Sequence, residues 1–537
     1  MKAEKLFLGN ILTMDERYHF FKAMTVTGGK VTYVGSESIA RQLCDENTEI
    51  IDFGENFIYP GMIEGHCHPD LAGMRLALQA DLSKDVSMED YCDTVRRFVE
   101  SNPELDEYRG SGWSEKDEKP CAAQLDRICA GKPVVLNSID GHSMWLNTKA
   151  MEKYGINADA VRQWGTDIVR INADGTPTGY VSEGPVQDIN LAGKYTSEQL
   201  ENSVLVWQKF AFEHGFTAVM HAGIQESRIP IYKKLINEGK FKLKTYACVL
   251  LDEREPDYPA AVRKARELAD KYNDDVFRII GIKVFMDGVV EAHTAWLRDG
   301  YNDDPENTGV KRMRDPQRFT ELLIEAAKND LIVHCHTIGD GAIDFALDCI
   351  EKAETETGRM NMRNALAHLQ VMRPDQVDKL VDLNVVGVVA PLWTAKVPGV
   401  YEQEISYCGK ARADASYPIE SIFKRGGFAA FHSDYPVSSK VSIPRSVYMA
   451  VTRRSPGEGE ETLRNPAECT NRFEALAGLT TGAAYSVCDE NRIGKLDIGY
   501  AADMTVYDVD FLNDDIEKTV TSKHIATIVN GEIVWKD

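Results

Sequence analysis

The stretch Pro60-Gly-Met-Ile-Glu-Gly-His-Cys-His68 is a short apolar run that ends on two histidines. On an extended strand, residues two apart share a face, so His66 and His68 point the same way and Cys67 points the other way. Two imidazoles on one face can hold one cation, at about 2.0–2.1 Å for zinc. The pair alone does not decide this, because a polar loop can carry two histidines without binding anything.

Further apolar, β-branched runs follow this stretch and alternate with amphipathic segments. Alternating strands and helices predict a parallel sheet, and eight such strands predict a closed (β/α)8 barrel of the α/β class. The first expected strand ends near His66, and the others lie at 217–221, 246–250, 279–285, 331–336, 365–368, 385–389 and 428–432.

A long segment, about residues 70 to 210, separates the first expected strand from the second. An ordinary connection between a strand and a helix takes only a few residues besides the helix. We therefore expect an inserted lid subdomain after strand one. The segment contains an apolar run at 133–137, and the alternative is that this run is itself a barrel strand.

Both ends of the chain have the character of β-structure. Strand-like runs flank Gly28-Gly29 near the start and Asn530-Gly531 near the end, which are typical hairpin turns. We expect the two ends to form one small β-sandwich domain, residues 1–59 with 486–537, beside a barrel at 60–485.

Composition limits the class of partner. Acidic residues number 84 against 61 lysines and arginines, for a formal charge of −23, which disfavours nucleic acid. The N-terminal apolar stretch is too short for a signal-peptide core, and no run of about 18 apolar residues predicts a membrane span. The 11 cysteines contain no C-x-x-C pair, which favours reduced thiols. We expect a cytoplasmic protein that acts on a small molecule, with no membrane partner.

Polar residues gather where the expected strands end, the rim at which barrel enzymes place their catalytic groups. His336 and His368 each close an apolar strand, although singly each also fits a satisfied core histidine. Lys283 lies inside a buried run, where an ammonium is costly unless it has a purpose or pairs with Asp287. Asp434 follows the last strand and could simply cap a turn. Seven of the 12 histidines lie at strand ends: His66, His68, His221, His334, His336, His368 and His432.

The order of these polar residues resembles that of the amidohydrolase superfamily. It consists of two histidines at strand one, a lysine in strand four, single histidines at strands five and six, and an aspartate at strand eight. Within this superfamily the chain is similar to the YtcJ-like branch, which includes N-substituted formamide deformylase. The resemblance covers nearly the whole chain through Pro60–His68, Gly112-Trp113, Asp140–Ser143, Lys283–Gly288, His336–Asp340, Ser433–Val437, Thr480–Tyr485 and Gly494–Asp503.

This resemblance implies a metal site with one or two divalent ions. His66, His68 and Asp434 would hold one ion, and His336 and His368 a second. Lys283, carboxylated by CO2, would bridge the two ions, which would also explain a buried lysine. Zinc is the default metal, although such ligands also suit manganese or iron. The superfamily further implies a homodimer.

The same resemblance implies a metal-dependent hydrolase that cleaves a carbon–nitrogen bond of the amide type, other than a peptide bond. The metal would lower the pKa of its water from about 15.7 toward about 7. Asp434 would take the proton from that water and pass it to the leaving nitrogen. A cyclic-amide hydrolase or a deaminase on the same scaffold is an alternative. A non-catalytic binding homologue is disfavoured, because all six metal positions are filled.

The substrate contacts are expected in the insertion and in the loop after strand four. His142 is a candidate catalytic donor to the substrate carbonyl, or a loop histidine bonded to backbone. Trp113 either walls the pocket or anchors the insertion. At 287–295 related sequences usually read Asp-Gly-x-x-Gly-Ser-Arg-Thr-Ala, whereas this chain places Glu291 and His293 in that loop. We expect both to contact substrate, which puts a formamide preference in doubt.

Three strand-end histidines are left without an assigned role. His334 shares a face with His336 and could support it from deeper in the barrel. His432 stands where glycine is commoner in related sequences, and His221 ends the second strand.

Overall fold

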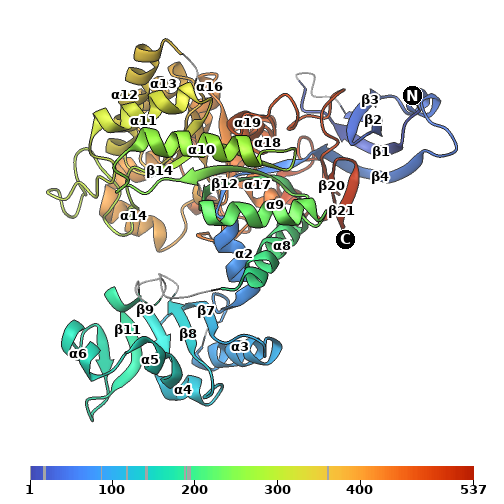
Figure 1. The fold of residues 1–537 in the computed structure, drawn as a ribbon. Coiled ribbons are helices and arrows are strands. Elements are labelled where there is room, and N and C mark those ends of the chain that lie inside the picture. Colours follow the sequence, from blue (N-terminus) through green and yellow to red (C-terminus); the bar gives the residue numbers. More distant parts are fainter. Residues whose placement is uncertain are drawn as a thin grey trace. The chain divides into compact units, whose positions relative to one another are not determined.

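A computed structural model describes residues 2–15, 20–85, 87–115, 119–138, 143–186, 189, 195–359, 362–438 and 440–537. The chain divides into two compact units. One unit comprises Met1–His68 and Gln208–Asp537, and the other comprises Pro69–Trp207. Each unit is described by itself (Figure 1).

The first unit contains an eight-stranded sheet in which every ladder is parallel, so the predicted barrel is confirmed. Seven of its strands follow one another in chain order from β12 to β18, and β5 pairs with β12. The strands are β5 (Met62–Cys67), β12 (Phe216–Ile224), β13 (Lys244–Leu250), β14 (Phe277–Phe285), β15 (Ile332–Thr337), β16 (Ala365–His368), β17 (Val386–Val389) and β18 (Ala429–Phe431).

Amphipathic helices follow the strands, as the alternating pattern predicts. Figure 1 shows α10 to α13, coloured green to yellow, on the outside of strands such as β14. The helices of this unit include α9 (Ile229–Asn237), α10 (Tyr258–Tyr272), α11 (Pro316–Lys328), α12 (Asp340–Thr357), α13 (Pro374–Asp382), α14 (Val400–Cys408), α16 (Ile419–Lys424), α17 (Ile443–Thr452), α18 (Arg472–Leu479) and α19 (Thr481–Ser486).

The barrel interior is apolar toward the amino ends of the strands. A buried cluster draws Ile63, Met220, Ile332 and Val386 from four different strands and includes Ala483 of α19. Residues that follow on the same strands are histidines and other polar groups. The packed core and the polar rim therefore occupy opposite ends of the barrel, as the barrel fold requires.

The barrel closes through loops, because no ladder joins β5 to β18 among the described strands. The amide of Asp434 donates to the carbonyl of His66 (3.1 Å), and the amide of His68 donates to the carbonyl of Tyr435 (2.9 Å). A Cβ at Gly65 would lie 2.6 Å from the carbonyl oxygen of Phe431, so only glycine permits this approach. The seam that results carries the candidate site.

The two termini build a second sheet of seven strands, in the order β21-β20-β19-β4-β1-β2-β3. The β-structure predicted from both termini is confirmed, and it takes the form of one mixed sheet. β4 links the halves, because it is parallel to β1 and antiparallel to β19. The strands are β1 (Lys5–Leu12), β2 (Phe20–Thr27), β3 (Lys30–Gly35), β4 (Glu49–Pro60), β19 (Met504–Tyr507), β20 (His524–Val529) and β21 (Glu532–Lys536).

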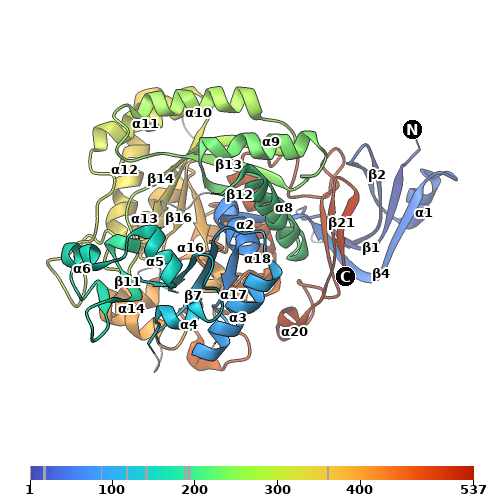
Figure 2. The ribbon, with the colours of Figure 1, turned by 60° about the horizontal axis from the view of Figure 1, so that its bottom comes forward.

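The second unit has its own six-stranded sheet, in the order β10-β11-β9-β8-β7-β6. The apolar run at 133–137 falls in β8 of this sheet, so the alternative that it is a barrel strand is wrong. Figure 2 shows α3, α4 and α5 of this unit in blue to cyan. Its elements include α2 (Pro69–Leu78), β6 (Gln79–Asp81), α3 (Met88–Ser101), β7 (Tyr108–Trp113), α4 (Ala122–Asp126), β8 (Val134–Ser138), β9 (Ser143–Leu146), α5 (Thr148–Tyr154), α6 (Ala158–Trp164), β10 (Val169–Ile171) and β11 (Pro177–Ser182).

Helix α8 (Ser197–Glu213) leads from this unit into β12. Across the residues that the structure describes, no helix combines the length and the hydrophobicity needed to cross a bilayer.

Candidate metal centre

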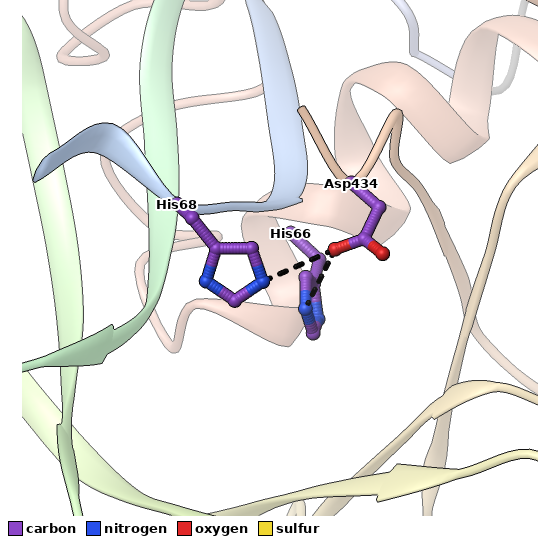
Figure 3. Close-up of side chains that lie close together, drawn as sticks. All are labelled: His66, His68 and Asp434. Atoms are coloured by element: carbon purple, nitrogen blue, oxygen red, sulfur yellow. Dashed lines mark ion pairs between the residues drawn. The ribbon is translucent and has the colours of Figure 1, made fainter. Parts of the chain in front are cut away.

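His66, His68 and Asp434 converge at the seam of the barrel (Figure 3). The Oδ1 atom of Asp434 lies 3.4 Å from Nε2 of His66 and 3.2 Å from Nε2 of His68. One ligand atom from each residue lies within 4.8 Å of the others. Two imidazole nitrogens and a carboxylate oxygen form a donor set that suits a divalent transition metal.

The surroundings of His66 fit a cation at this point. The side chain is buried, and its Nε2 atom has no hydrogen-bond partner among the described groups. A buried polar nitrogen normally has a partner, because leaving it unpaired costs about 1–3 kcal/mol. A metal ion held between His66, His68 and Asp434 would supply that partner.

The other nitrogen of the same ring is already in use. Nδ1 of His66 lies 2.7 Å from Nε2 of His334, a hydrogen bond that reaches across the barrel interior. Such a bond fixes the ring orientation and keeps Nε2 for the metal. His334 thus contacts His66, whereas the sequence pattern placed it with His336.

Backbone geometry also marks the site. Asp434 has φ of 60° and His368 has φ of 81°, both in the left-handed region that non-glycine residues rarely occupy. Such conformations persist only where the surrounding structure enforces them, and they concentrate at functional sites. Glu64 helps to hold Asp434 in this backbone conformation. The Oε1 atom of Glu64 accepts a hydrogen bond from the backbone amide of Ser433, the residue before Asp434, at 2.8 Å.

His336 and His368 lie beside each other, with ring centroids 4.7 Å apart. Nδ1 of His336 lies 3.1 Å from Oδ1 of Asp287, and the same carboxylate accepts the amides of Ile338 and Gly339. Asp287 therefore fixes the orientation of the His336 ring. The alternative in which Asp287 pairs with Lys283 is not what the structure shows.

Lys283 is fully buried, and its ammonium has no hydrogen-bond partner among the described groups. Burial lowers the pKa of this lysine to about 8, although the carboxylate of Asp434 opposes the shift. Roughly a tenth of the amine is thus neutral at pH 7. Lys283 is therefore a buried amine without a hydrogen-bonding counterpart among the described residues.

The remaining strand-end histidines lie in two environments. The His432 ring is buried with its centroid 5.2 Å from that of His66 and 5.1 Å from that of His368, and burial lowers its pKa to about 4. It belongs to the polar cluster, in line with its predicted place at a strand end directly before Ser433-Asp434. His221 instead lies near Tyr232 of α9, at 6.3 Å between ring centroids, on the helix side of the barrel wall.

Comparisons with known proteins identify the family of this chain. A model of the amidohydrolase family matches residues 49–535. The chain belongs to that family. A relative in Bacillus subtilis (strain 168), a putative amidohydrolase YtcJ, is 27% identical over 541 residues and covers 98% of each chain. The N-substituted formamide deformylase of Arthrobacter pascens is 20% identical over 515 residues, with 93% of this chain and 92% of that one covered. The predicted family resemblance is confirmed.

Solved structures agree with the fold of this amidohydrolase. A metal-dependent hydrolase from Pyrococcus furiosus is 25% identical, with a TM-score of 0.77 over 95% of this chain and all of that one. Its counterpart from Pyrococcus horikoshii OT3 is 23% identical, with a TM-score of 0.78 over 95% and 99% of the two chains. The family and the His66, His68 and Asp434 cluster together identify a metal-dependent hydrolase.

The amidohydrolase has a cavity of about 360 Å³ that reaches some of the candidate metal ligands. His336, His368 and Asp434 line it together with Glu291, so this predicted substrate contact does face the cavity. His293 is not among the lining residues. Its Nε2 lies 3.1 Å from both carboxylate oxygens of Asp303, and its ring packs on Tyr301 and Tyr407. Its backbone has a left-handed φ of 53°.

The two predicted contacts from the insertion have different outcomes. Trp113 is 1% exposed, donates its indole N–H to the carbonyl of Leu136 (2.8 Å) and packs on Trp145 and Tyr180. Within its own unit it is a core residue, which matches the anchoring role weighed for it. His142 lies outside the described residues.

Proposed function

We propose that this amidohydrolase cleaves a carbon–nitrogen bond of the amide type, other than a peptide bond, in a small molecule. The observation that supports this most directly is the cluster of His66, His68 and Asp434, whose aspartate lines a cavity large enough for a small substrate. A divalent ion bound there, zinc by default, would lower the pKa of a water molecule and polarise the scissile carbonyl.

Asp434 is the general base in this proposal. Its carboxylate lies in the cavity wall beside both histidines, within reach of a water that attacks a carbonyl carbon there. It accepts the proton from that water and donates it to the nitrogen that leaves as an amine. His336 and His368 would bind a second ion, and His334 and Asp287 orient the ligand rings.

Lys283 is proposed to be carboxylated. The neutral amine adds to CO2 and releases one proton, which leaves an anionic carbamate on Nζ. This change replaces an unpaired buried ammonium by an anion that can bridge two metal ions. It is supported by the missing hydrogen-bond partner and the lowered pKa of Lys283.

The test combines metal analysis with turnover of a panel of N-formyl and N-acetyl amines. We expect Asp434→Asn to lower kcat by about 10²- to 10⁴-fold, the usual contribution of a general base. Asp304→Asn is the matched control, since Asp304 lies in an exposed loop away from the cavity. Near-normal turnover by a metal-loaded Asp434→Asn enzyme would contradict the assigned role.

Lys283→Ala tests the second metal. We expect about two ions per wild-type chain and a mass on Lys283 under native conditions that corresponds to added CO2. The variant should lose the added mass and at least one ion. A single ion that is unaffected by the change would leave the hydrolase intact and make Lys283 structural. Protein never exposed to chelator that holds no metal would contradict the proposal as a whole.

A further inference from the structure

The cavity of the proposed amide hydrolase has a strongly apolar wall. Leu392, Trp393, Val397, Val400 and Val437 line it beyond the candidate metal ligands. Its volume of about 360 Å³ lies at the small end of the range of roughly 300–1,000 Å³ that is usual for small-molecule sites. A compact substrate with an apolar body fits such a space.

Two charged side chains in the cavity wall, Arg464 and Glu404, form an ion pair with each other. Arg464 donates from Nη2 to Oε2 of Glu404 at 2.5 Å, and Gln370 donates from Nε2 to the other oxygen of Glu404 at 2.6 Å. Both charged side chains are almost fully buried, so each is the partner that the other needs. This pair offers no net charge to a substrate.

Glu291 lines the same cavity without such a partner. Among the residues that the structure describes, no ion pair and no hydrogen bond to its carboxylate is found beyond that of its own backbone amide. The side chain is exposed to solvent, so a ligand can reach it. His293, two residues along the loop, does not compensate it, because that ring is bound to Asp303.

We propose that the substrate carries a cationic nitrogen on its apolar body and that Glu291 binds this group while the amide lies at the metal ligands. This inference rests on the proposed amide hydrolysis and specifies its substrate class: an amide with a protonated or quaternary amine at the opposite end. A carboxylate that faces an apolar cavity without a counter-ion favours a cation by charge, and a substrate cation gains a charge-assisted hydrogen bond or ion pair.

The kinetic test uses three formanilides and the three matching acetanilides that differ only in the para group: aminomethyl, ethyl or carboxymethyl. The aminomethyl group is a cation of nearly the size of ethyl. We expect the wild-type enzyme to favour it over ethyl by about tenfold in kcat/KM, and carboxymethyl to be the poorest. Glu291→Gln should abolish the preference, and Glu306→Gln, in the same loop but away from the cavity, should keep it.

A binding test separates the two proposals. 4-Methylbenzylammonium, 4-methylbenzyl alcohol and 4-methylbenzoate carry no amide, so their calorimetric binding does not depend on turnover. The ammonium probe should bind about tenfold more weakly to Glu291→Gln than to wild type or Glu306→Gln. Amide turnover without any charge preference, or a preference that survives Glu291→Gln, overturns the inference and leaves the hydrolase. Glu291-dependent binding of the ammonium probe without turnover of any amide overturns the hydrolase and leaves the cation site.

Discussion

At the scale of single residues, Glu64 connects the first barrel strand to the last. It is 3% exposed, and its Oε1 atom accepts the backbone amides of Ser433 at 2.8 Å and His66 at 3.4 Å. Both amides belong to the backbone that carries the candidate metal ligands His66 and Asp434. The side chain therefore sets the positions of His66 and Asp434 without needing to touch a metal.

We expect Glu64→Ala to weaken metal binding and lower the free energy of unfolding by about 2–3 kcal/mol, because it leaves two buried amides without an acceptor. Glu64→Gln keeps an acceptor oxygen at the same distance from the backbone. It should therefore retain most of the metal affinity and most of the free energy of unfolding. Denaturant titration and metal content of the two variants check this. Equal metal affinity in Glu64→Ala and wild type would show that the seam holds without this carboxylate.

The sequence predicted the residues of the site better than their pairings. His66, His68 and Asp434 follow from strand ends and from the order of the motifs. The bond between His66 and His334 does not, because spacing along one strand shows which residues share a face and not which residue they meet across a barrel. His293, a predicted substrate contact, shows the same limit: its contact with Asp303, ten residues along the loop, did not follow from the sequence pattern.

At the scale of elements, the seam between β5 and β18 depends on Gly65. Its missing side chain lets the carbonyl of Phe431 approach, and a Cβ would lie 2.6 Å from that oxygen. Backbone cannot yield as a flexible side chain can, so the strands must separate to accept any larger residue.

Gly65→Ala should therefore cost about 1–3 kcal/mol of stability, the usual penalty for overpacking, and should reduce metal affinity because His66 and Asp434 move apart. Gly131→Ala is the matched control, since a Cβ there meets nothing within 4 Å. Thermal unfolding with and without added zinc measures both effects. A Gly65→Ala protein with unchanged melting temperature and metal affinity would rule out a tight seam.

Helices and strands with a clear periodic pattern of apolar residues could be predicted from the sequence. The neighbouring strands with which they pair were harder to predict. The eight barrel strands follow from apolar runs separated by helices. The run at 133–137 was ambiguous, because a short apolar strand has the same composition in either sheet. The position of β4 between β1 and β19 could also not be predicted from the sequence. β4 and β19 are more than 440 residues apart in the chain, and such a distant pairing leaves no local sequence pattern.

At the scale of the whole molecule, the chain consists of two units with separate cores. Trp113 lies in a cluster with Tyr91, Leu125, Leu136 and Trp145 that belongs wholly to residues 69–207. The barrel has its own buried cluster. Damage to one core should therefore leave the other intact.

We expect Trp113→Ala to destabilise the second unit by about 3–5 kcal/mol, because it removes a large buried side chain and its bond to Leu136. Calorimetry should resolve an earlier transition in this variant, while the metal content of the protein remains that of wild type. Trp113→Phe keeps an aromatic ring and should be milder. Loss of the metal in step with this transition would show that the two units unfold as one.

The terminal sheet also governs how the chain folds as it is made. β4 has β1 on one side, but its other neighbour, β19, begins at Met504, some 440 residues after β4 ends at Pro60. At about 5–20 residues per second, a ribosome needs roughly 20–90 s to cover that distance. For that time the nascent chain carries an open strand edge, the kind of surface that recruits another strand. We expect this edge to need shielding, by a chaperone or by the ribosome surface, until the last strands emerge.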